Sequence, residues 1–499
     1  MNWIDICHFS YTYPDGIFPA LMDINLSIDR GAFIVLTGKS GSGKSTLGKA
    51  LAGFLFQDEK PKYSGSIFVN GQDMTLIPLY QASQYVAYVQ QNPEDQFCTL
   101  SVADEIAFGL ENRCVEPHEI EHRIAETLDI VEGKSLLNRD IATLSGGEKQ
   151  KISIASMLAL RPDVLILDEP TSNLDPIATQ NIFTTLHHMR LQSNLTIVII
   201  EHKLEQLVDF NPEIYVLEHA AVDNIDTFSD YQSYLKARFF SLPDLQKKDH
   251  GNVSSSVEIN TINVQLDQKP ILENISLRLF PGEFIALMGP NASGKSTLLQ
   301  TMMGLYRLTS GSMTIFEHDM SRTKTSALVQ DIGFIFQNPD HQLFTQSVWD
   351  EVTLTAKNLG LCTEDLKGRT IDWLKRIGLD NRLQDHPQRL SYGEKRRLNL
   401  LSVILHQPRM LLIDEFLIGQ DMANANAWMS FFRDYAHLGN IVLLVNHHAL
   451  LSQKYCDRII FIDQGKVLID DPVQEAFKCL RSTGFKVFTA QPSGVFPNA

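Results

Sequence analysis

The sequence predicts an α/β protein made of two copies of one domain. Short apolar runs with strand character alternate with helical patterns along the chain, which favours mostly parallel sheets flanked by helices. A glycine-rich motif occurs twice, as GKSGSGKST at 38–46 and as GPNASGKST at 289–297. A chain of 499 residues is also too long for a single hydrophobic core, so at least two domains are expected.

Each glycine-rich motif follows a predicted buried strand, FIVLTG (33–38) or FIALMG (284–289), and precedes a helical pattern. In that setting G-x-x-x-x-G-K-[ST] is a phosphate-binding loop, because its glycines let backbone N–H groups and a helix N-terminus point at phosphate oxygens. Lys44 and Lys295 are predicted to reach the β- and γ-phosphates, so the chain is expected to bind two nucleotides. The predicted loop residues, of which Ser45 and Ser296 would also hold Mg²⁺, are Gly38, Lys39, Ser40, Gly41, Ser42, Gly43, Lys44, Ser45, Thr46, Gly289, Pro290, Asn291, Ala292, Ser293, Gly294, Lys295, Ser296 and Thr297.

Paired carboxylates end a second predicted strand in each copy, VLILDE and MLLIDE. Ligands of open α/β sheets bind at this edge. The aspartates, Asp168 and Asp414, can hold Mg²⁺, and the glutamates, Glu169 and Glu415, can orient or activate the attacking water of phosphoryl transfer. Such a pair can also simply be solvated, but the two phosphate-binding loops favour the catalytic interpretation.

The motifs recur in the same order at a nearly constant separation, which indicates an internal duplication. Lys44 and Lys295 are 251 positions apart, and Glu169 and Glu415 are 246 apart. A polar stretch between the copies has the composition of a linker. The expected divisions of the chain are a first domain at 1–240, a linker at 241–256, a second domain at 257–483 and a loose tail at 484–499.

Composition restricts the possible functions. The net charge is −16, which argues against a protein whose main task is to grip nucleic acid. The six cysteines form no C-x-x-C pair and are expected to be reduced thiols of a cytosolic protein. The first residues do not resemble a signal peptide, and no apolar run approaches the roughly 20 residues that span a bilayer. If a membrane is involved, another polypeptide is expected to cross it.

The segments LSGGEKQ (144–150) and LSYGEKR (390–396) carry a decisive resemblance. In order between a phosphate-binding loop and an Asp-Glu strand, they are typical of ATP-binding cassette (ABC) ATPases, and the resemblance covers both halves, to about residue 480. It implies tandem P-loop NTPase domains, each with a mostly parallel sheet core, an antiparallel β region and a helical subdomain that carries the signature. It also implies ATP hydrolysis with Mg²⁺.

In that family two cassettes pack head to tail, and each ATP lies between the phosphate-binding loop of one and the signature of the other. The helix N-terminus and serine of the signature then supply hydrogen-bond donors to the γ-phosphate. The signature residues that the resemblance assigns are Ser145, Gly147 and Glu148 for the nucleotide held by Lys295, and Ser391, Gly393 and Glu394 for the nucleotide held by Lys44.

Four further residues match other motifs of the family. Gln91 and Gln337 resemble the Q-loop glutamine, which contacts Mg²⁺ and the attacking water. His202 and His447 resemble the switch histidine, which contacts the γ-phosphate. His448 follows His447 directly and leaves the second of these assignments open.

The family stacks an aromatic side chain on adenine, and the two halves differ here. Tyr13 is placed like that aromatic, with Tyr11 as the alternative, whereas no aromatic lies near 264–266. The Lys295 site is therefore expected to bind ATP less tightly. Tyr392 also replaces a glycine of the signature. Because both copies keep the lysine, glutamate and histidine, we predict two competent sites.

The segments after the Q-loop glutamines, QNPEDQF (91–97) and QNPDHQLF (337–344), indicate a subgroup. They resemble the energy-coupling-factor (ECF) ATPases of vitamin and metal-ion importers, where N-P-x-x-Q is typical and meets a transmembrane scaffold protein. The alternative is a plain surface turn. The fused cassettes resemble importers of hydroxymethylpyrimidine (HMP), a thiamine precursor, with cobalt importers next. The residues expected to contact the partner are Asp95, Gln96, Phe97, His341, Gln342 and Phe344.

The resemblance implies one chain per complex at the cytoplasmic face of the cell membrane, bound to the scaffold (T-type) protein and a small substrate-binding membrane protein. Two alternatives remain. One is the fused ATPase of a sugar or other importer, whose second half often loses catalytic residues, unlike this chain. The other is a ribosome-acting ABC protein, which tends to have a long charged linker, whereas the linker here is short and the net charge is acidic.

Overall fold

The computed structural model describes residues 3–490, apart from residues 15, 17, 58–60, 173, 203, 219, 226–254 and 362–363. Most of the predicted linker and the end of the predicted tail lie outside these described residues. The chain divides into two compact units, Met1–Ser241 with Gly419–Ala425, and Leu242–Ile418 with Asn426–Ala499.

The centre of the first unit is a six-stranded sheet. Its neighbouring strands pair in parallel, except for the antiparallel pair at one edge formed by β9 and β10. In spatial order the strands are β10 (Ala221–Ile225), β9 (Glu213–Glu218), β3 (Phe33–Gly38), β8 (Thr196–Ile200), β7 (Val164–Asp168) and β6 (Val86–Val89).

Strand β3 is buried on both faces, because successive side chains of a strand point in opposite directions. Phe33 and Val35 contribute to one hydrophobic core, while Ile34 and Leu36 contribute to another. The continuous apolar run that predicted this strand is therefore explained by two cores that sandwich the sheet.

An antiparallel sheet of four strands covers one of these cores together with a short helix, α1 (Lys44–Leu51). The strands of this sheet, in spatial order, are β2 (Leu21–Ile28), β1 (Ile4–Thr12), β4 (Lys62–Val69) and β5 (Gln72–Asp73). This sheet is the antiparallel β region that the resemblance implies.

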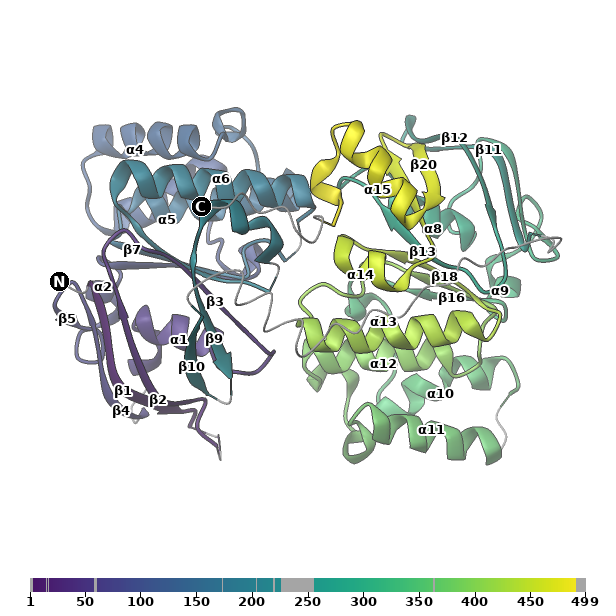
Figure 1. Ribbon diagram of the computed structural model, residues 1–499, viewed down its shortest axis with the longest axis horizontal. Helices are drawn as coiled ribbons and strands as arrows, with labels where there is room; N and C mark the ends of the chain where they lie inside the picture. Colours follow the sequence, from purple (N-terminus) through teal and green to yellow (C-terminus); the bar gives the residue numbers. More distant parts are fainter. Residues whose placement is uncertain are drawn as a thin grey trace. The chain divides into compact units, whose positions relative to one another are not determined.

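Helices cover the other core of the first unit, and three of them pack together as a helical subdomain (Figure 1). The longest helix, α6 (Pro176–Ser193), starts and stops at recognisable signals: Asp175 accepts a hydrogen bond from the backbone of Ala178, and Asn194 ends it in the left-handed conformation. The three subdomain helices are α3 (Val102–Asn112), α4 (Pro117–Ile130) and α5 (Gly146–Ala159). A four-residue helix, α2 (Leu79–Ala82), precedes β6.

The second unit repeats both sheets with the same pairing order. The six-stranded sheet consists of β16 (Ile332–Ile335), β17 (Met410–Ile413), β18 (Ile441–Val445), β13 (Phe284–Met288), β19 (Arg458–Asp463) and β20 (Lys466–Pro472). The antiparallel sheet consists of β12 (Lys269–Leu279), β11 (Val257–Leu266), β14 (Ser310–Ile315) and β15 (His318–Asp319). This repetition, with α/β units of mixed sheets, confirms the predicted fold class.

The helices of the second unit also follow the order of the first. Figure 1 shows α10, α11 and α12 gathered on one side of the six-stranded sheet, away from β11 and β12. The helices are α8 (Lys295–Met302), α9 (Thr325–Leu328), α10 (Val348–Asn358), α11 (Glu364–Arg376), α12 (Tyr392–Ile404), α13 (Met422–His437), α14 (Ala449–Tyr455) and α15 (Val473–Ser482).

The start of the predicted loose tail is packed, contrary to the sequence expectation. A 3₁₀ turn forms at Lys486–Phe488, and Phe488 is fully buried against the rings of Phe461 and Phe485. The sequence shows no periodicity here because a single aromatic anchor, rather than an amphipathic face, fixes the segment.

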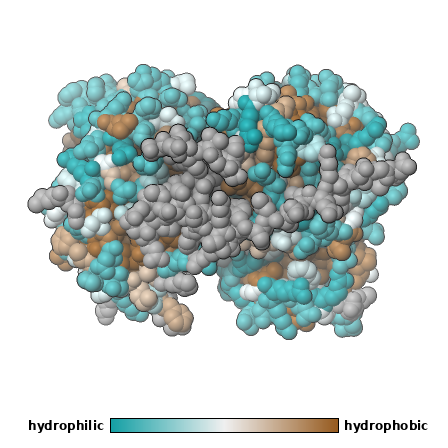
Figure 2. All heavy atoms as spheres, viewed as in Figure 1, coloured by the Kyte–Doolittle hydropathy of each residue, from teal (hydrophilic) through white to brown (hydrophobic). Residues whose placement is uncertain are grey.

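The visible face of each unit is mostly hydrophilic, with smaller hydrophobic patches (Figure 2). Within the part of the chain that the structure describes, every helix is too short or too polar to cross a membrane.

Candidate active sites

Each phosphate-binding loop lies between the strand and helix that the sequence predicted. In the first unit, residues 38–46 connect β3 to α1, and Gly43 directly precedes the helix with a φ of 103°. This conformation is in the region that glycine tolerates, and a Cβ atom here would lie 2.5 Å from the carbonyl oxygen of Ala20. Gly294 precedes α8 with the same φ in the second unit.

The lysine of each loop folds back over its own loop. Lys44 Nζ donates to the carbonyl oxygens of Gly38 and Lys39, at 3.0 and 2.8 Å. Lys295 Nζ donates to those of Gly289 and Pro290, at 3.0 and 2.6 Å. Burial lowers the pKa of the Lys44 ammonium, and the nearby Glu169 carboxylate opposes that shift. Both ammonium groups thus lie within the curve of their own loop, where a phosphate is predicted to bind.

The aspartate of the first site is buried and bonded through both oxygens. Asp168, at the end of β7, accepts a 3.1 Å hydrogen bond from Ser45 Oγ and a 2.6 Å bond from the Tyr88 hydroxyl. Burial raises the pKa of Asp168, the Glu169 charge adds to that shift, and the two hydrogen bonds oppose it. The same burial, together with the Asp168 charge, raises the pKa of the Tyr88 hydroxyl.

The aspartate of the second site has a different environment. Asp414 follows β17 and is 4% exposed, and its Oδ1 has no hydrogen-bond partner among the described residues. Burial raises the pKa of Asp414 to about 6, Ser296 lowers it and Glu415 raises it. The position equivalent to Tyr88 is Phe334, which has no hydroxyl to offer. Sequence reasoning missed this difference, although the letters at the two positions show it.

In the first unit, predicted site residues from three separate motifs meet at Glu169. Gln91 Nε2 donates a 2.7 Å hydrogen bond to Glu169 Oε2, and His202 Nε2 lies 3.2 Å from Glu169 Oε1. Each carboxylate oxygen of Glu169 therefore contacts a different side chain: Oε2 contacts Gln91 and Oε1 contacts His202.

The second unit repeats this constellation. Gln337 Nε2 donates to Glu415 Oε2 at 2.6 Å, and His447 Nε2 lies 3.1 Å from Glu415 Oε1. His448 instead precedes α14 as its N-cap residue, so His447 is the histidine that contacts the glutamate.

Both glutamates have left-handed backbones, with φ of 45° for Glu169 and 48° for Glu415. Such values are uncommon for residues other than glycine and cost free energy, and they cluster at functional sites. The same conformation recurs at these equivalent positions in both units.

The two tyrosines near the start of the chain have different surroundings. Tyr11 is 1% exposed within the core, whereas Tyr13 is 41% exposed. The Tyr13 hydroxyl lies 3.1 Å from Thr46 Oγ1 of the phosphate-binding loop, and its ring packs edge-on against Tyr11. Of the two, Tyr13 alone presents a ring to solvent beside the loop.

Each signature forms the N-terminus of a helix and caps it with a capping box. Ser145 Oγ accepts from the backbone N–H of Glu148, while Glu148 Oε2 accepts from the backbone N–H of Ser145 at 2.7 Å. Ser391 and Glu394 make the same pair of bonds at the start of α12. The S-x-x-E spacing, which is a capping box in sequence, explains why these helices begin here.

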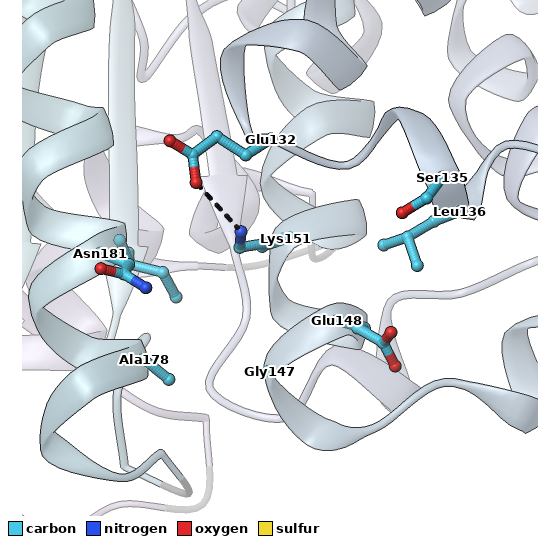
Figure 3. Close-up of a pocket in the computed structure, with 9 residues that line it drawn as sticks. Glu132, Ser135, Leu136, Gly147, Glu148, Lys151, Ala178 and Asn181 are labelled. Carbon is cyan, nitrogen blue, oxygen red and sulfur yellow. Dashed lines mark ion pairs between the residues drawn. The ribbon is translucent and has the colours of Figure 1, made fainter.

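A pocket of about 290 Å³ lies beside the first signature, between α5 and α6 (Figure 3). Glu132 and Lys151 point toward each other across it at 3.9 Å, and Glu148 lies on the opposite side of the view. The lining residues are Glu132, Ser135, Leu136, Gly147, Glu148, Lys151, Ala178, Asn181 and Ile182.

Tyr392, which replaces a signature glycine, is supported by Arg396 one helical turn later. Arg396 donates a 2.9 Å hydrogen bond to the Tyr392 hydroxyl, and its guanidinium lies 4.8 Å from the ring centroid. Arg396 also donates to the carbonyl oxygen of Phe416, just after Glu415, the predicted catalytic residue. The sequence analysis noted Tyr392 only as a departure and missed this link between the signature helix and the catalytic loop.

The segments after the Q-loop glutamines form short 3₁₀ turns at Pro93–Asp95 and Pro339–His341. Gln96 accepts from the backbone of Gln90 and donates to the carbonyl of Ser153, and Gln342 is likewise bonded to backbone groups of its own unit. These two glutamines brace the loop from inside and do not project outward as the sequence analysis expected.

The remaining predicted contact residues differ in exposure. Asp95 and His341 are exposed, and Phe344 is 71% exposed. Phe97 is partly buried and packs against the core of the first unit. Of the predicted contact residues, Asp95, His341 and Phe344 are therefore the exposed ones.

The residues at each site fit a magnesium ion, whose usual protein ligands are oxygens. Each half brings an aspartate carboxylate beside a serine hydroxyl, with a glutamine amide in contact with the neighbouring glutamate. The unpartnered Oδ1 of Asp414 is a buried acceptor of the kind that such an ion would satisfy.

Comparisons with known proteins agree with this geometry. The family model described as "ABC transporter" matches residues 21–172 and 272–417. A "Putative ABC transporter ATP-binding protein" of Methanosarcina mazei is 32% identical, over 94% of this chain and 89% of the relative. The "Putative HMP/thiamine import ATP-binding protein YkoD" of Bacillus subtilis is 30% identical, over 93% of this chain and 91% of the relative.

Among solved structures, cbiO1 of Clostridium perfringens, described as part of the ABC transporter complex cbiONQ, is 28% identical, with a TM-score of 0.42 over 48% of this chain and 96% of that one. The family model alone covers more than half of this sequence, in two matches that each include one phosphate-binding loop and one Asp-Glu pair. The chain therefore belongs to the ABC transporter family, as a tandem-cassette protein that binds and hydrolyses ATP.

Proposed function

We propose that this ATPase is the energy-coupling subunit of an ECF-type importer, at the cytoplasmic face of the cell membrane. Its partners are a transmembrane scaffold protein and a small substrate-binding membrane protein. The proposed cargo is a vitamin or metal ion, with HMP or thiamine first and cobalt next.

The observation that carries this proposal is the pair of N-P-x-x-Q turns directly after Gln91 and Gln337. Each turn is anchored from inside by Gln96 or Gln342, so the backbone next to the catalytic glutamine is held in one shape. A partner that pushes on the exposed part of the turn would thereby move the glutamine that contacts Glu169 or Glu415. The relative named for HMP/thiamine import supports the choice of cargo.

In this proposal equivalent residues have the same role in ATP hydrolysis at the two sites. Lys44 and Lys295 bind the β- and γ-phosphates, while Asp168 and Asp414, with the loop serines and Q-loop glutamines, hold Mg²⁺, which supplies charge neutralisation when bound. Glu169 and Glu415 orient the attacking water, because both oxygens of each carboxylate are already positioned by glutamine and histidine. Ser145 and Ser391 supply donors to phosphate oxygens, and Tyr13 stacks on adenine.

Intact complexes from native membranes test the proposal. The tagged chain is extracted in mild detergent, and the proteins and small molecules that co-purify are identified by mass spectrometry. A multi-span scaffold protein and a small membrane protein that retains HMP or thiamine are expected. Recovery of ribosomes instead, or of the membrane domains of a sugar importer, would overturn the ECF assignment. A variant with Phe344→Ser and Asp95→Lys should lose the scaffold while keeping its ATPase activity.

A further inference from the structure

Each signature glutamate is paired with an arginine of its own unit. Arg139 Nη1 donates to Glu148 Oε1 at 2.9 Å, and Arg382 Nη1 donates to both oxygens of Glu394 at 3.0 and 3.1 Å. Each carboxylate also accepts the backbone N–H of Ser145 or Ser391 in the capping box, and Glu394 accepts a further hydrogen bond of 2.8 Å from Ser391 Oγ.

The two arginines do not occupy equivalent positions. With the separation of 246 that relates Glu148 to Glu394, Arg139 corresponds to Asp385 and Arg382 corresponds to Leu136. Each half of the chain thus forms a guanidinium–carboxylate pair at its signature, but the arginine comes from a different position in the segment before the signature. A contact inherited passively from a common ancestor would occur at one position, so its recurrence from two positions points to a shared requirement.

Stability of the fold does not account for that requirement. Both pairs are partly exposed, at 39% for Arg139 and 32% for Glu148, and at 32% for Arg382 and 19% for Glu394, and ion pairs of this kind add little to stability. The requirement is instead electrostatic: the signature helix presents its N-terminus, which favours anions, next to a carboxylate, which repels them.

We propose that Arg139 and Arg382 are positioning residues that neutralise the signature glutamates, so that phosphate oxygens of ATP can approach the N-termini of α5 and α12. This inference rests on the proposed role of the signatures in ATP binding, but not on the importer assignment. Each arginine acts through its glutamate and need not touch the nucleotide. The glutamate is retained because it accepts the backbone N–H of the serine in the capping box. The arginine reduces the repulsion between the glutamate carboxylate and the phosphates.

The test is rescue within a double-mutant cycle on the full chain. Arg139→Leu should raise the KM for ATP roughly tenfold at low salt and less at high salt, because screening weakens an uncompensated charge. Adding Glu148→Gln to Arg139→Leu should return the KM to within about twofold of the parent, because the charge that needed neutralising is gone. Arg382→Leu with and without Glu394→Gln repeats the cycle in the other half; because Arg382 also pairs with Asp385 at 2.7 Å, Asp385→Asn is added to both of these variants.

A second readout does not depend on turnover. The concentration of a non-hydrolysable ATP analogue with Mg²⁺ that gives half-maximal thermal stabilisation should follow the same pattern of loss and rescue. Arg161→Leu serves as the matched control, since Arg161 pairs with Glu119 and Glu126 away from the signature, and it should change neither quantity.

The alternative outcomes are distinct. Arg139 also donates to the carbonyl oxygen of Thr143, so a purely structural arginine would give a loss that Glu148→Gln leaves uncorrected and Arg139→Lys only partly repairs. That result, or an unchanged KM in both arginine variants, would overturn the inference. Purification without membrane partners would count against the importer proposal alone, because the cycle needs only the chain and nucleotide. If one arginine variant does not fold, the cycle in the other half decides.

Discussion

The Tyr88 hydroxyl donates a 2.6 Å hydrogen bond to Asp168, and the equivalent side chain in the second half is Phe334, which leaves Asp414 Oδ1 without a partner among the described residues. The two sites share their glutamate, glutamine and histidine geometry and differ at the aspartate. This difference makes the two halves distinguishable in solution.

Exchange of these two side chains should have opposite effects. Tyr88→Phe removes a buried hydrogen bond to a charged group and should lower the free energy of unfolding by about 1–3 kcal/mol. Phe334→Tyr adds a hydroxyl at the matching position and should raise it by about 1 kcal/mol. Urea unfolding without nucleotide or Mg²⁺ measures both, and two changes of the same sign would contradict the asymmetry.

The raised pKa of Asp414 predicts a pH-dependent gain of stability in Asp414→Asn. The native carboxyl, with a pKa of about 6, holds its proton more tightly than the unfolded one at 3.8, so ionisation destabilises the native state as pH rises through this window. Without Mg²⁺ the variant should be more stable above pH 6, by up to about 3 kcal/mol at ~1.4 kcal/mol per pKa unit. The advantage should vanish as the pH falls toward 4.

A carboxylate with the opposite shift provides the control for that experiment. Hydrogen bonds from Lys357 and Ser347 lower the pKa of Asp350, so Asp350→Asn should give no gain above pH 6. Equal gains in both variants would show that reduced net charge, and not the burial of Asp414, is responsible.

The paired constellations around Glu169 and Glu415 predict two working sites. Glu169→Gln and Glu415→Gln should each remove at least half of the ATPase rate, and the double variant should lose about 100-fold or more, as expected for a positioned catalytic carboxylate. Steady-state phosphate release measures this, with Glu132→Gln as an exposed acidic control. A single variant with full activity would show that the sites are not equivalent.

Tyr11 is buried and Tyr13 is exposed, so their substitution should affect stability and ATP binding separately, which the sequence alone could not predict. Tyr13→Ala should raise the KM for ATP and leave the unfolding free energy nearly unchanged, because the ring is 41% exposed. Tyr11→Ala should cost about 3–5 kcal/mol of stability, as for other large core aromatics. Thermal unfolding together with ATP titration distinguishes them, and a Tyr13 variant that binds ATP normally would argue against adenine stacking.

Local sequence patterns predicted the elements whose causes are local. The loops at Lys44 and Lys295, the strands before Asp168 and Asp414, and the tandem α/β fold all depend on apolar runs and glycines close together in sequence. Family motifs singled out Gln91, His202 and Glu169 separately, and the structure brings the first two into contact with Glu169, which the motifs did not specify.

The missed features are contacts between residues distant in sequence. Tyr88 meets Asp168 from a neighbouring strand, and Arg396 reaches the loop after Glu415 from a helix. Gln96 was expected to point outward because nothing in its own segment shows that the carbonyl of Ser153 lies behind it. Pairings of this kind depend on strand order and helix placement, which residue spacing alone does not specify.

Because Gly43 has no side chain, the predicted phosphate-binding loop can pack directly on the segment between β1 and β2, which also carries Tyr13, the predicted adenine-stacking residue. The loop packs so closely on the turn before β2 that a single carbon atom would collide with the Ala20 carbonyl, and Tyr13, from the same hairpin, reaches Thr46. A shift of the hairpin is therefore transmitted directly to the loop. Under the proposed stacking of adenine on Tyr13, the base and the phosphates would therefore rest on one continuous set of contacts.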